Sequence, residues 1–378
     1  MTHHFFNESL QQTPVRIANT QTFASIMLDK NEQSNDVDVE LKTRVMDKLL
    51  HADWNRYPSA CNADIENKIA GYCHLNKENI VLSGGSATMI TALLNYFALN
   101  GKTITIVQPS YSLFEYHCNT YNIAYTPWML TADLEFDYDH MPMLDKHSVL
   151  IITSPNNPTG NAIDTNQLQE LLHKHPESLI ILDGVYTEFC AEDVTSLIHS
   201  HPNLIVLRSF SKAFPVAGLR LGYLCAAPGI ASVVRKLILQ FSITPFSLIF
   251  AREILFDKEF MRSSQQRVQD IIRQRENVSN TIARLFSGEI LTVFPSQGNF
   301  LLIRIHDDTY FNNLMEDLAE AGIKVLNTSS FLLLENTFRV SVGTTSENNV
   351  FLTCLQNSLE SNDYNTGLLI ENNTLQVA

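Results

Sequence analysis

The sequence predicts an α/β fold, with a large domain built on a mostly parallel sheet that helices cover on both faces, and a smaller α+β domain. Between about residues 79 and 225, short apolar runs typical of buried strands alternate with segments of helical spacing, as in chains of βα units. From about residue 299, a shorter set of strand-like and helical runs follows a long polar helical pattern. We therefore expect an N-terminal arm, a large domain, a small domain and a polar tail, at residues 1–30, 31–250, 251–360 and 361–378.

The strands and helices follow from periodicity and length. Short β-rich or apolar runs predict strands at 79–82, 103–107, 149–153, 179–183 and 204–207. The continuous apolar run at 149–153 is typical of a buried parallel strand. Helical spacing of apolar residues predicts helices in the large domain at 39–52, 89–98 and 166–175. A helical pattern at 251–286 leads into the small domain. There we expect strands at 299–305 and 338–342, and helices at 311–321 and 347–359.

The composition is that of a soluble globular protein, with 45% hydrophobic and 17% charged residues. No apolar run approaches the ~20 residues of a membrane-spanning helix, and the first residues lack the pattern of a signal peptide. A net charge of −14 argues against nucleic-acid binding. The six cysteines are scattered without CxxC pairs, which favours reduced thiols over a disulfide framework or a zinc site. We expect a cytoplasmic protein without a metal, a membrane or a nucleic-acid partner.

Polar and glycine-rich turns directly follow several predicted strands, which is where open α/β sheets bind ligands. The turn 83–88 leads from a strand into a helix, so its backbone N–H groups can bind an anion. The turn 154–160 holds an asparagine amide between two prolines, and this amide can donate to a ligand oxygen. Asp183 ends an apolar strand and requires a positive partner there. Plain turns and a helix cap are the alternatives at these places.

The stretch 209–223 carries one lysine among hydroxyls, small residues and apolar ones. Loss of hydration lowers the pKa of such a lysine, which supplies the free amine that a Schiff base with an aldehyde needs. Arg220, Ser209 and Ser211 can hold a phosphate through hydrogen bonds. An aldehyde together with a phosphate points to pyridoxal 5'-phosphate, with Lys212 as the reactive amine; a solvated surface lysine is the alternative.

This stretch, S-F-S-K-A-F-P-V-A-G-L-R-L-G-Y, resembles the lysine motif of the fold-type I pyridoxal-phosphate aminotransferases of class I/II. The resemblance extends over roughly residues 28–359, with further motifs in the family's order. It implies that Lys212 forms the Schiff base with the cofactor and that Arg220 binds its phosphate. Pro215 departs from the glycine or alanine common in relatives.

Four more motifs imply cofactor contacts in the same resemblance. The turn S-G-G-S-A-T resembles the family's phosphate loop, although Thr88 replaces an acidic residue, and it implies backbone contacts at Gly85, Ser86 and Ala87. P-S-Y implies that Tyr111 stacks on the pyridine ring, and S-P-N-N-P-T-G implies that Asn157 contacts the ring hydroxyl. D-G-V-Y, in which Gly184 stands where the family has glutamate, implies that Asp183 contacts the cofactor nitrogen and that Tyr186 contacts the ring oxygen. A carboxylate at the nitrogen keeps it protonated, so that the ring remains an electron sink.

Two residues are implied to reach the site from further away. W-N-R-Y-P resembles a family segment in which the tyrosine, here Tyr57, binds the cofactor phosphate of the neighbouring subunit; a turn aromatic covering a helix end is the alternative. F-R-V-S-V-G resembles the family's strand whose arginine, here Arg339, binds the substrate carboxylate through two hydrogen bonds. A salt bridge on the sheet face is the alternative. The resemblance thus implies a homodimer with shared active sites, and amino acids and 2-oxo acids as substrates.

The nearest branch is similar to the histidinol-phosphate aminotransferases, whose opening segment L-x-x-N-E recurs at 28–32. Those enzymes usually carry an arginine for the substrate phosphate where this chain has Leu326. We therefore expect an α-amino acid with a neutral side chain to be preferred over histidinol phosphate, unless Lys324, Arg304 or Arg16 compensates. A decarboxylase or oxidase on the same fold is an alternative. A pyridoxal-binding regulator is disfavoured because no DNA-binding domain precedes the motifs.

Overall fold

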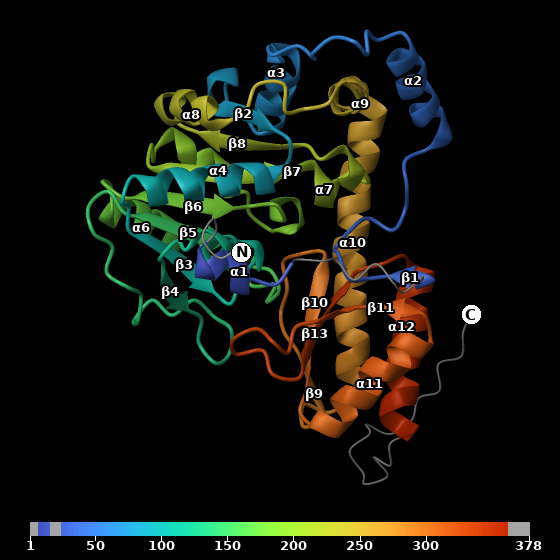
Figure 1. Cartoon of the computed structure of the whole chain (residues 1–378). Helices are drawn as coiled ribbons and strands as arrows, with labels where there is room; N and C mark the ends of the chain where they lie inside the picture. The colour runs from blue at the N-terminus through green and yellow to red at the C-terminus, as the bar shows by residue number, and fades with distance from the viewer. Residues whose placement is uncertain (1–6, 16–23, 362–378) are drawn as a thin grey trace.

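The computed structural model describes residues 7–15 and 24–361, and it contains two main sheets (Figure 1). The larger sheet has seven strands in the order β2-β8-β7-β6-β5-β3-β4. Its neighbours are parallel from β7 through β6, β5 and β3 to β4, whereas β8 pairs antiparallel with β2 and β7. These strands are β2 (Ile80–Ser83), β3 (Ile104–Gln108), β4 (Thr126–Met129), β5 (Val149–Thr153), β6 (Leu179–Asp183), β7 (Leu204–Ser209) and β8 (Gly222–Ala226). The predicted α/β class with a mostly parallel sheet is confirmed.

The large sheet is buried on both faces, which explains its continuous apolar strands. Along β5, Leu150 and Ile152 belong to one apolar core, while Val149 and Ile151 belong to a second core on the opposite face. Side chains of α3 (Ala63–Tyr72), α6 (Thr165–Lys174) and α9 (Pro245–Phe256) line the first core. Those of α4 (Ser86–Leu99), α5 (Leu113–Tyr121) and α8 (Pro228–Val234) line the second. Because β3 to β7 are parallel, their carboxyl ends lie along the same edge of the sheet.

The helical pattern at 251–286 corresponds to the end of α9 and to α10 (Lys258–Leu285). Asp257 separates them, because its side chain accepts hydrogen bonds from the backbone N–H groups of Glu259 and Phe260 and so caps α10. Aspartate stabilises a helix more at this position than in the interior. The 28-residue α10 runs alongside both sheets and joins them (Figure 1).

The smaller sheet has four antiparallel strands in the order β12-β13-β10-β9. They are β9 (Leu291–Val293), β10 (Phe300–Ile305), β12 (Leu326–Asn327) and β13 (Thr337–Ser341). α11 (Asp308–Glu320) and α12 (Thr345–Ser361) contribute Phe311, Leu314 and Phe351 to the core that this sheet shares with α10. The predicted polar tail lies, apart from residue 361, outside the described residues.

The N-terminal arm is tied to the smaller sheet's side of the molecule. β1 (Ile26–Met27) pairs parallel with β11 (Ile323–Lys324), and the next residue, Leu28, exchanges backbone hydrogen bonds with Lys324 and Ser341. From there the chain passes on to α2 (Val39–Leu50), which packs on α9. Nearer the start of the arm lies the short helix α1 (Glu8–Gln12). None of the helices in the described ranges is both long and apolar enough to span a membrane.

Candidate active site

The turn between β2 and α4 lies against Arg220. Gly85 has a φ of 101°, and a Cβ there would lie 3.2 Å from a guanidinium nitrogen of Arg220. At Gly222 a Cβ would meet the backbone nitrogen of Ser86 at 2.5 Å. Glycine at both positions thus allows strand β8 and the exposed guanidinium of Arg220 to lie close to the first turn of α4. This first turn carries no acidic residue. A cation beside unpaired N–H groups suits a phosphate.

The lysine stretch brings a second group of polar atoms to this place. The single-turn helix α7 (Phe210–Ala213) is capped by Ser209, whose hydroxyl oxygen accepts from the backbone N–H of Ser211 at 3.1 Å. The Ser211 hydroxyl lies 3.5 Å from Arg220, which therefore faces both α4 and α7. The predicted phosphate residues Gly85, Ser86, Ser211 and Arg220 are close together, while the oxygen of Ser209 already serves as a helix cap.

Lys212 is half-buried beside these residues. Its Nζ donates a hydrogen bond to the carbonyl oxygen of Lys30, at 2.7 Å, so the arm lies directly against the amine. Burial, with a further contribution from Arg339, lowers the pKa of Lys212 to about 8. About a tenth of such an amine is uncharged at pH 7, far more than for a lysine with an ordinary pKa.

Asp183 ends β6 and is buried, with 1% of its surface exposed. Its Oδ1 has no hydrogen-bond partner in the described part of the chain. Burial raises the pKa of this carboxyl to about 7, although the Val185 backbone N–H and Lys212 act in the opposite direction. A buried carboxylate oxygen without a partner fits a ligand that carries a positive charge at this point.

Asn157, Tyr186 and Arg339 meet between the two sheets. Arg339 of β13 donates to the side-chain oxygen of Asn157 and to the backbone oxygen of Asp29, and its Nε has no partner among the described residues. Tyr186 accepts a hydrogen bond from Asn31 at 2.9 Å. Burial raises the pKa of Tyr186 to about 12 and lowers the pKa of Arg339. The electrostatic influence of Tyr111 on both groups places it in the same neighbourhood.

Tyr57 does not join this group within one chain. Its side chain is 82% exposed and stacks on Phe241 with 4.9 Å between ring centroids. Phe241 has a φ of 62°, in the left-handed region that bulky residues rarely adopt. The structure thus places Tyr57 in an exposed aromatic pair rather than at the cofactor residues of its own chain.

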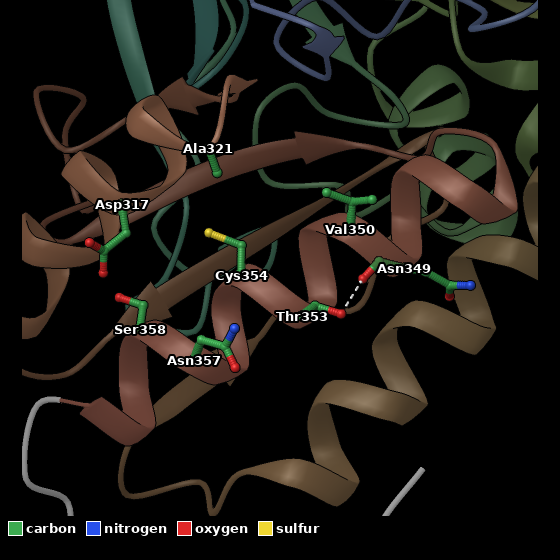
Figure 2. Close-up of a pocket in the computed structure, with 8 residues that line it drawn as sticks. All are labelled: Asp317, Ala321, Asn349, Val350, Thr353, Cys354, Asn357 and Ser358. Carbon is green, nitrogen blue, oxygen red and sulfur yellow. Dashed lines mark hydrogen bonds between the residues drawn. The ribbon is translucent and has the colours of Figure 1, made fainter. Parts of the chain in front are cut away.

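Sequence reasoning gave no site role to Asn31, Asn299 and Ser341, which join the arm, the smaller sheet and Tyr186 by hydrogen bonds. Two cavities lie apart from the site. One, of about 560 Å³, lies between α11 and α12 (Figure 2). The other, of about 330 Å³, lies beside the buried ion pair of Arg208 and Glu188, 2.8 Å apart. Neither is lined by the predicted cofactor residues.

Comparison with known proteins identifies the kind of site. The model of the family "Aminotransferase class I and II" matches residues 25–355. A histidinol-phosphate aminotransferase of Thermococcus gammatolerans is 30% identical over 332 residues, 88% of this chain and 91% of that protein. The fold is similar to a histidinol-phosphate aminotransferase from Sinorhizobium meliloti in complex with pyridoxal-5'-phosphate, with a TM-score of 0.73, 19% identity and coverage of 89% and 92% of the two chains. L-threonine-O-3-phosphate decarboxylase from Porphyromonas gingivalis shares it too, with a TM-score of 0.73, 21% identity and coverage of 89% and 99%.

Proposed function

The chain belongs to the aminotransferase class I and II family and is a pyridoxal-phosphate-dependent aminotransferase, and we propose that its amino donor is an α-amino acid with a neutral side chain. The observation that carries this proposal is the pairing of Leu326 on β12 with Arg339 on β13. The substrate's carboxylate would bind to Arg339, and its side chain would face a leucine.

The residues at the site fit the cofactor. When bound, pyridoxal phosphate supplies an aldehyde that takes up the amino group and a ring that accepts the electron pair of the broken C–H bond. Arg220, Ser211 and the first N–H groups of α4 would hold its phosphate. The unpartnered Oδ1 of Asp183 would hold the protonated ring nitrogen. Asn157 and Tyr186 would contact the ring oxygen, and Tyr111 would stack on the ring.

Lys212 would bind the cofactor covalently and then move the proton of the substrate's α-carbon. With a pKa of about 8 the released amine can accept a proton at neutral pH and return it in the next step. The arm carbonyl of Lys30 accepts from Nζ and holds the amine within the site.

Arg339 would recognise the substrate carboxylate. Its hydrogen-bond partners are the side-chain amide oxygen of Asn157 and the backbone oxygen of Asp29. Both oxygens are uncharged, so the charge of Arg339 is not neutralised by a direct hydrogen bond to a carboxylate. A buried guanidinium with an unpartnered Nε gains most from a ligand that brings a negative charge and two oxygen acceptors. An α-carboxylate has both.

The same region holds little to recognise a second negative charge. Lys324 lies 3.4 Å from the carboxylate of Asp29, and Arg304 donates to the backbone oxygen of Leu333 at 2.6 Å while stacking on Phe294. Both cations therefore have partners, and Arg16 lies outside the described residues. A hydrogen bond to a charged group is worth roughly 1.5–3 kcal/mol, so replacing an arginine by Leu326 should lower the preference for a phosphate about ten- to a hundredfold.

The proposal includes a homodimer in which Tyr57 reaches the phosphate of the partner's cofactor. The exposure of Tyr57 and its stacking on Phe241 support this, because a large aromatic pair on the surface is typical of an interface. A large domain at 31–250, a small domain at 251–360 and a cytoplasmic location belong to the same proposal.

The test compares kcat/KM across a panel of amino donors that includes neutral, acidic and aromatic amino acids and histidinol phosphate. We expect a neutral amino acid to rank first and Leu326→Arg to raise the relative value for histidinol phosphate at least tenfold. Leu99→Arg, which adds the same charge at a position 87% exposed, is the matched control and should change nothing. If histidinol phosphate gives the highest kcat/KM with the unchanged enzyme, the proposed substrate is wrong. Analysis of the product, a 2-oxo acid or an amine, separates transamination from decarboxylation.

A further inference from the structure

Asn31 joins three parts of the chain that are distant in sequence. Its backbone N–H donates to the Ser341 hydroxyl at 2.8 Å, and this hydroxyl donates to Asn31 Oδ1 at 2.9 Å. Its backbone oxygen accepts from the side chain of Asn299 at 3.0 Å. Its Nδ2 donates to the Tyr186 hydroxyl oxygen at 2.9 Å. With 0% of its surface exposed, Asn31 satisfies these groups entirely within the protein.

The backbone and the network both favour asparagine here. The φ of Asn31 is 54°, in the left-handed region where asparagine is enriched among residues with a side chain. The Ser341 hydroxyl accepts from the backbone N–H and so gives its own proton to Oδ1, which turns Nδ2 toward Tyr186. A buried amide that satisfies a donor and an acceptor at once defines a single orientation.

The direction of the hydrogen bond decides where the Tyr186 proton goes. Because the phenol oxygen accepts from Asn31, its own O–H is left to donate to another group. We propose that Asn31 is a positioning residue that directs the Tyr186 hydroxyl proton toward the ring oxygen of bound pyridoxal phosphate. This inference rests on the proposed contact between Tyr186 and that oxygen. The same bonds fasten the arm between the two sheets at the site.

The cofactor's absorbance reports this hydrogen bond directly. A donor at the ring oxygen stabilises the oxygen's negative charge, and losing the donor makes the oxygen more basic, so the pKa of the pH-dependent change in cofactor absorbance rises. The other titratable groups that act on Tyr186 are Arg339 of β13, Asp183 of β6 and Tyr111 after β3. All three are kept in the variants below.

The variants are Asn31→Asp and Asn31→Gly in the full-length loaded protein. Asn31→Asp is nearly isosteric and puts an acceptor where Nδ2 donates, so the Tyr186 proton should turn toward it. We expect the absorbance pKa to rise by about one unit or more and the Kd for the cofactor to rise about tenfold. Asn31→Gly keeps the left-handed backbone and removes the amide, and should shift both values in the same direction by less.

Asn79→Asp is the structural control. Asn79 is 4% exposed, and its Nδ2 donates to the backbone oxygen of Ala226 at 2.8 Å, away from the site. This variant should lower the temperature of unfolding and leave the absorbance pKa and the Kd unchanged. If it shifts the absorbance pKa as much as Asn31→Asp does, the effect is structural and the inference is wrong.

Tyr186→Phe separates this inference from the proposed function. If Tyr186→Phe raises the absorbance pKa and neither Asn31 variant does, Asn31 does not direct the proton, and the inference fails alone. If Tyr186→Phe leaves the absorbance pKa unchanged, the contact of Tyr186 with the ring oxygen is wrong and the inference falls with it. Should Asn31→Asp not fold, Asn31→Gly decides by the same two readouts.

Discussion

Replacing Asp183 by asparagine should stabilise the cofactor-free protein while weakening the loaded enzyme. Burial raises the pKa of Asp183 from its ordinary value of 3.8 to about 7. At 1.36 kcal/mol per pKa unit, this corresponds to a cost of about 4 kcal/mol for holding the carboxylate in its charged form in the folded chain. Asparagine has nearly the same shape and no charge, so Asp183→Asn avoids this cost.

The effect depends on pH with a definite sign. Between pH 3.8 and about 7 the folded protein keeps a proton on Asp183 that the unfolded chain releases, so the free energy of unfolding falls as the pH rises through this window. The advantage of Asp183→Asn is therefore absent below about pH 4 and complete above about pH 7. For cooperative unfolding of 378 residues, about 4 kcal/mol is a rise of about 5 °C in Tm.

Calorimetry of the cofactor-free proteins at pH 4, 6 and 8 measures this difference. Asp193→Asn is a control of opposite sign: burial alone would raise the pKa of Asp193, but its ion pair with Arg208, at 3.0 Å, lowers it. This variant should therefore lose stability at pH 8. With cofactor bound, the order of wild type and Asp183→Asn should reverse, and kcat should fall by orders of magnitude. A cofactor-free Asp183→Asn protein that melts at or below the wild-type temperature at pH 8 would refute the reasoning.

Two further predictions concern the lysine and the subunit contact. The purified protein should show a visible chromophore that borohydride fixes to residue 212. Since the pKa of Lys212 is about 8, the uptake of cofactor by the cofactor-free protein should accelerate from pH 6.5 and level off above about pH 9. Normal turnover by Lys212→Ala would contradict its role. Light scattering should give a dimer, and Tyr57→Phe should weaken cofactor binding about tenfold, the loss of one hydrogen bond to a charged group; a fully active monomer would exclude the proposed role of Tyr57.

Much of the larger sheet could be predicted because its strands are buried on both faces. The apolar runs in β5, β6 and β7 appear in the sequence without interruption. β8 was not predicted, because its first residues, Gly222 and Tyr223, belong to the lysine stretch and were interpreted as part of the cofactor motif rather than as a strand. The two-residue strand β1 has no periodicity of its own and depends entirely on its pairing with β11.

Some residues of the candidate site could likewise be predicted from the sequence and others could not. Asp183 and Lys212 could be found because each directly follows a strand and is chemically unusual there. The role of Asn31, which stands in the segment L-x-x-N-E, could not be predicted, because its hydrogen bonds to Ser341 cross 310 residues of sequence and exist only in the folded chain. A sequence pattern reports local periodicity and residue chemistry, whereas such a contact depends on how two sheets pack. The direction in which the Tyr186 hydroxyl donates also depends on a contact that forms only in the folded chain.

The pairing of β1 with β11 also bears on the order in which the protein is assembled. The arm leaves the ribosome before its partners Ile323 and Lys324, which lie roughly 300 positions later in the sequence. At about 5–20 residues per second, the arm waits roughly 15–60 s for the strand that fixes it. The larger sheet, including the Lys212 stretch, is synthesised during that interval. A nascent chain therefore contains every residue of the lysine stretch well before the arm can pair with β11, and the arm can reach its final place beside Lys212 only after β11 has been synthesised.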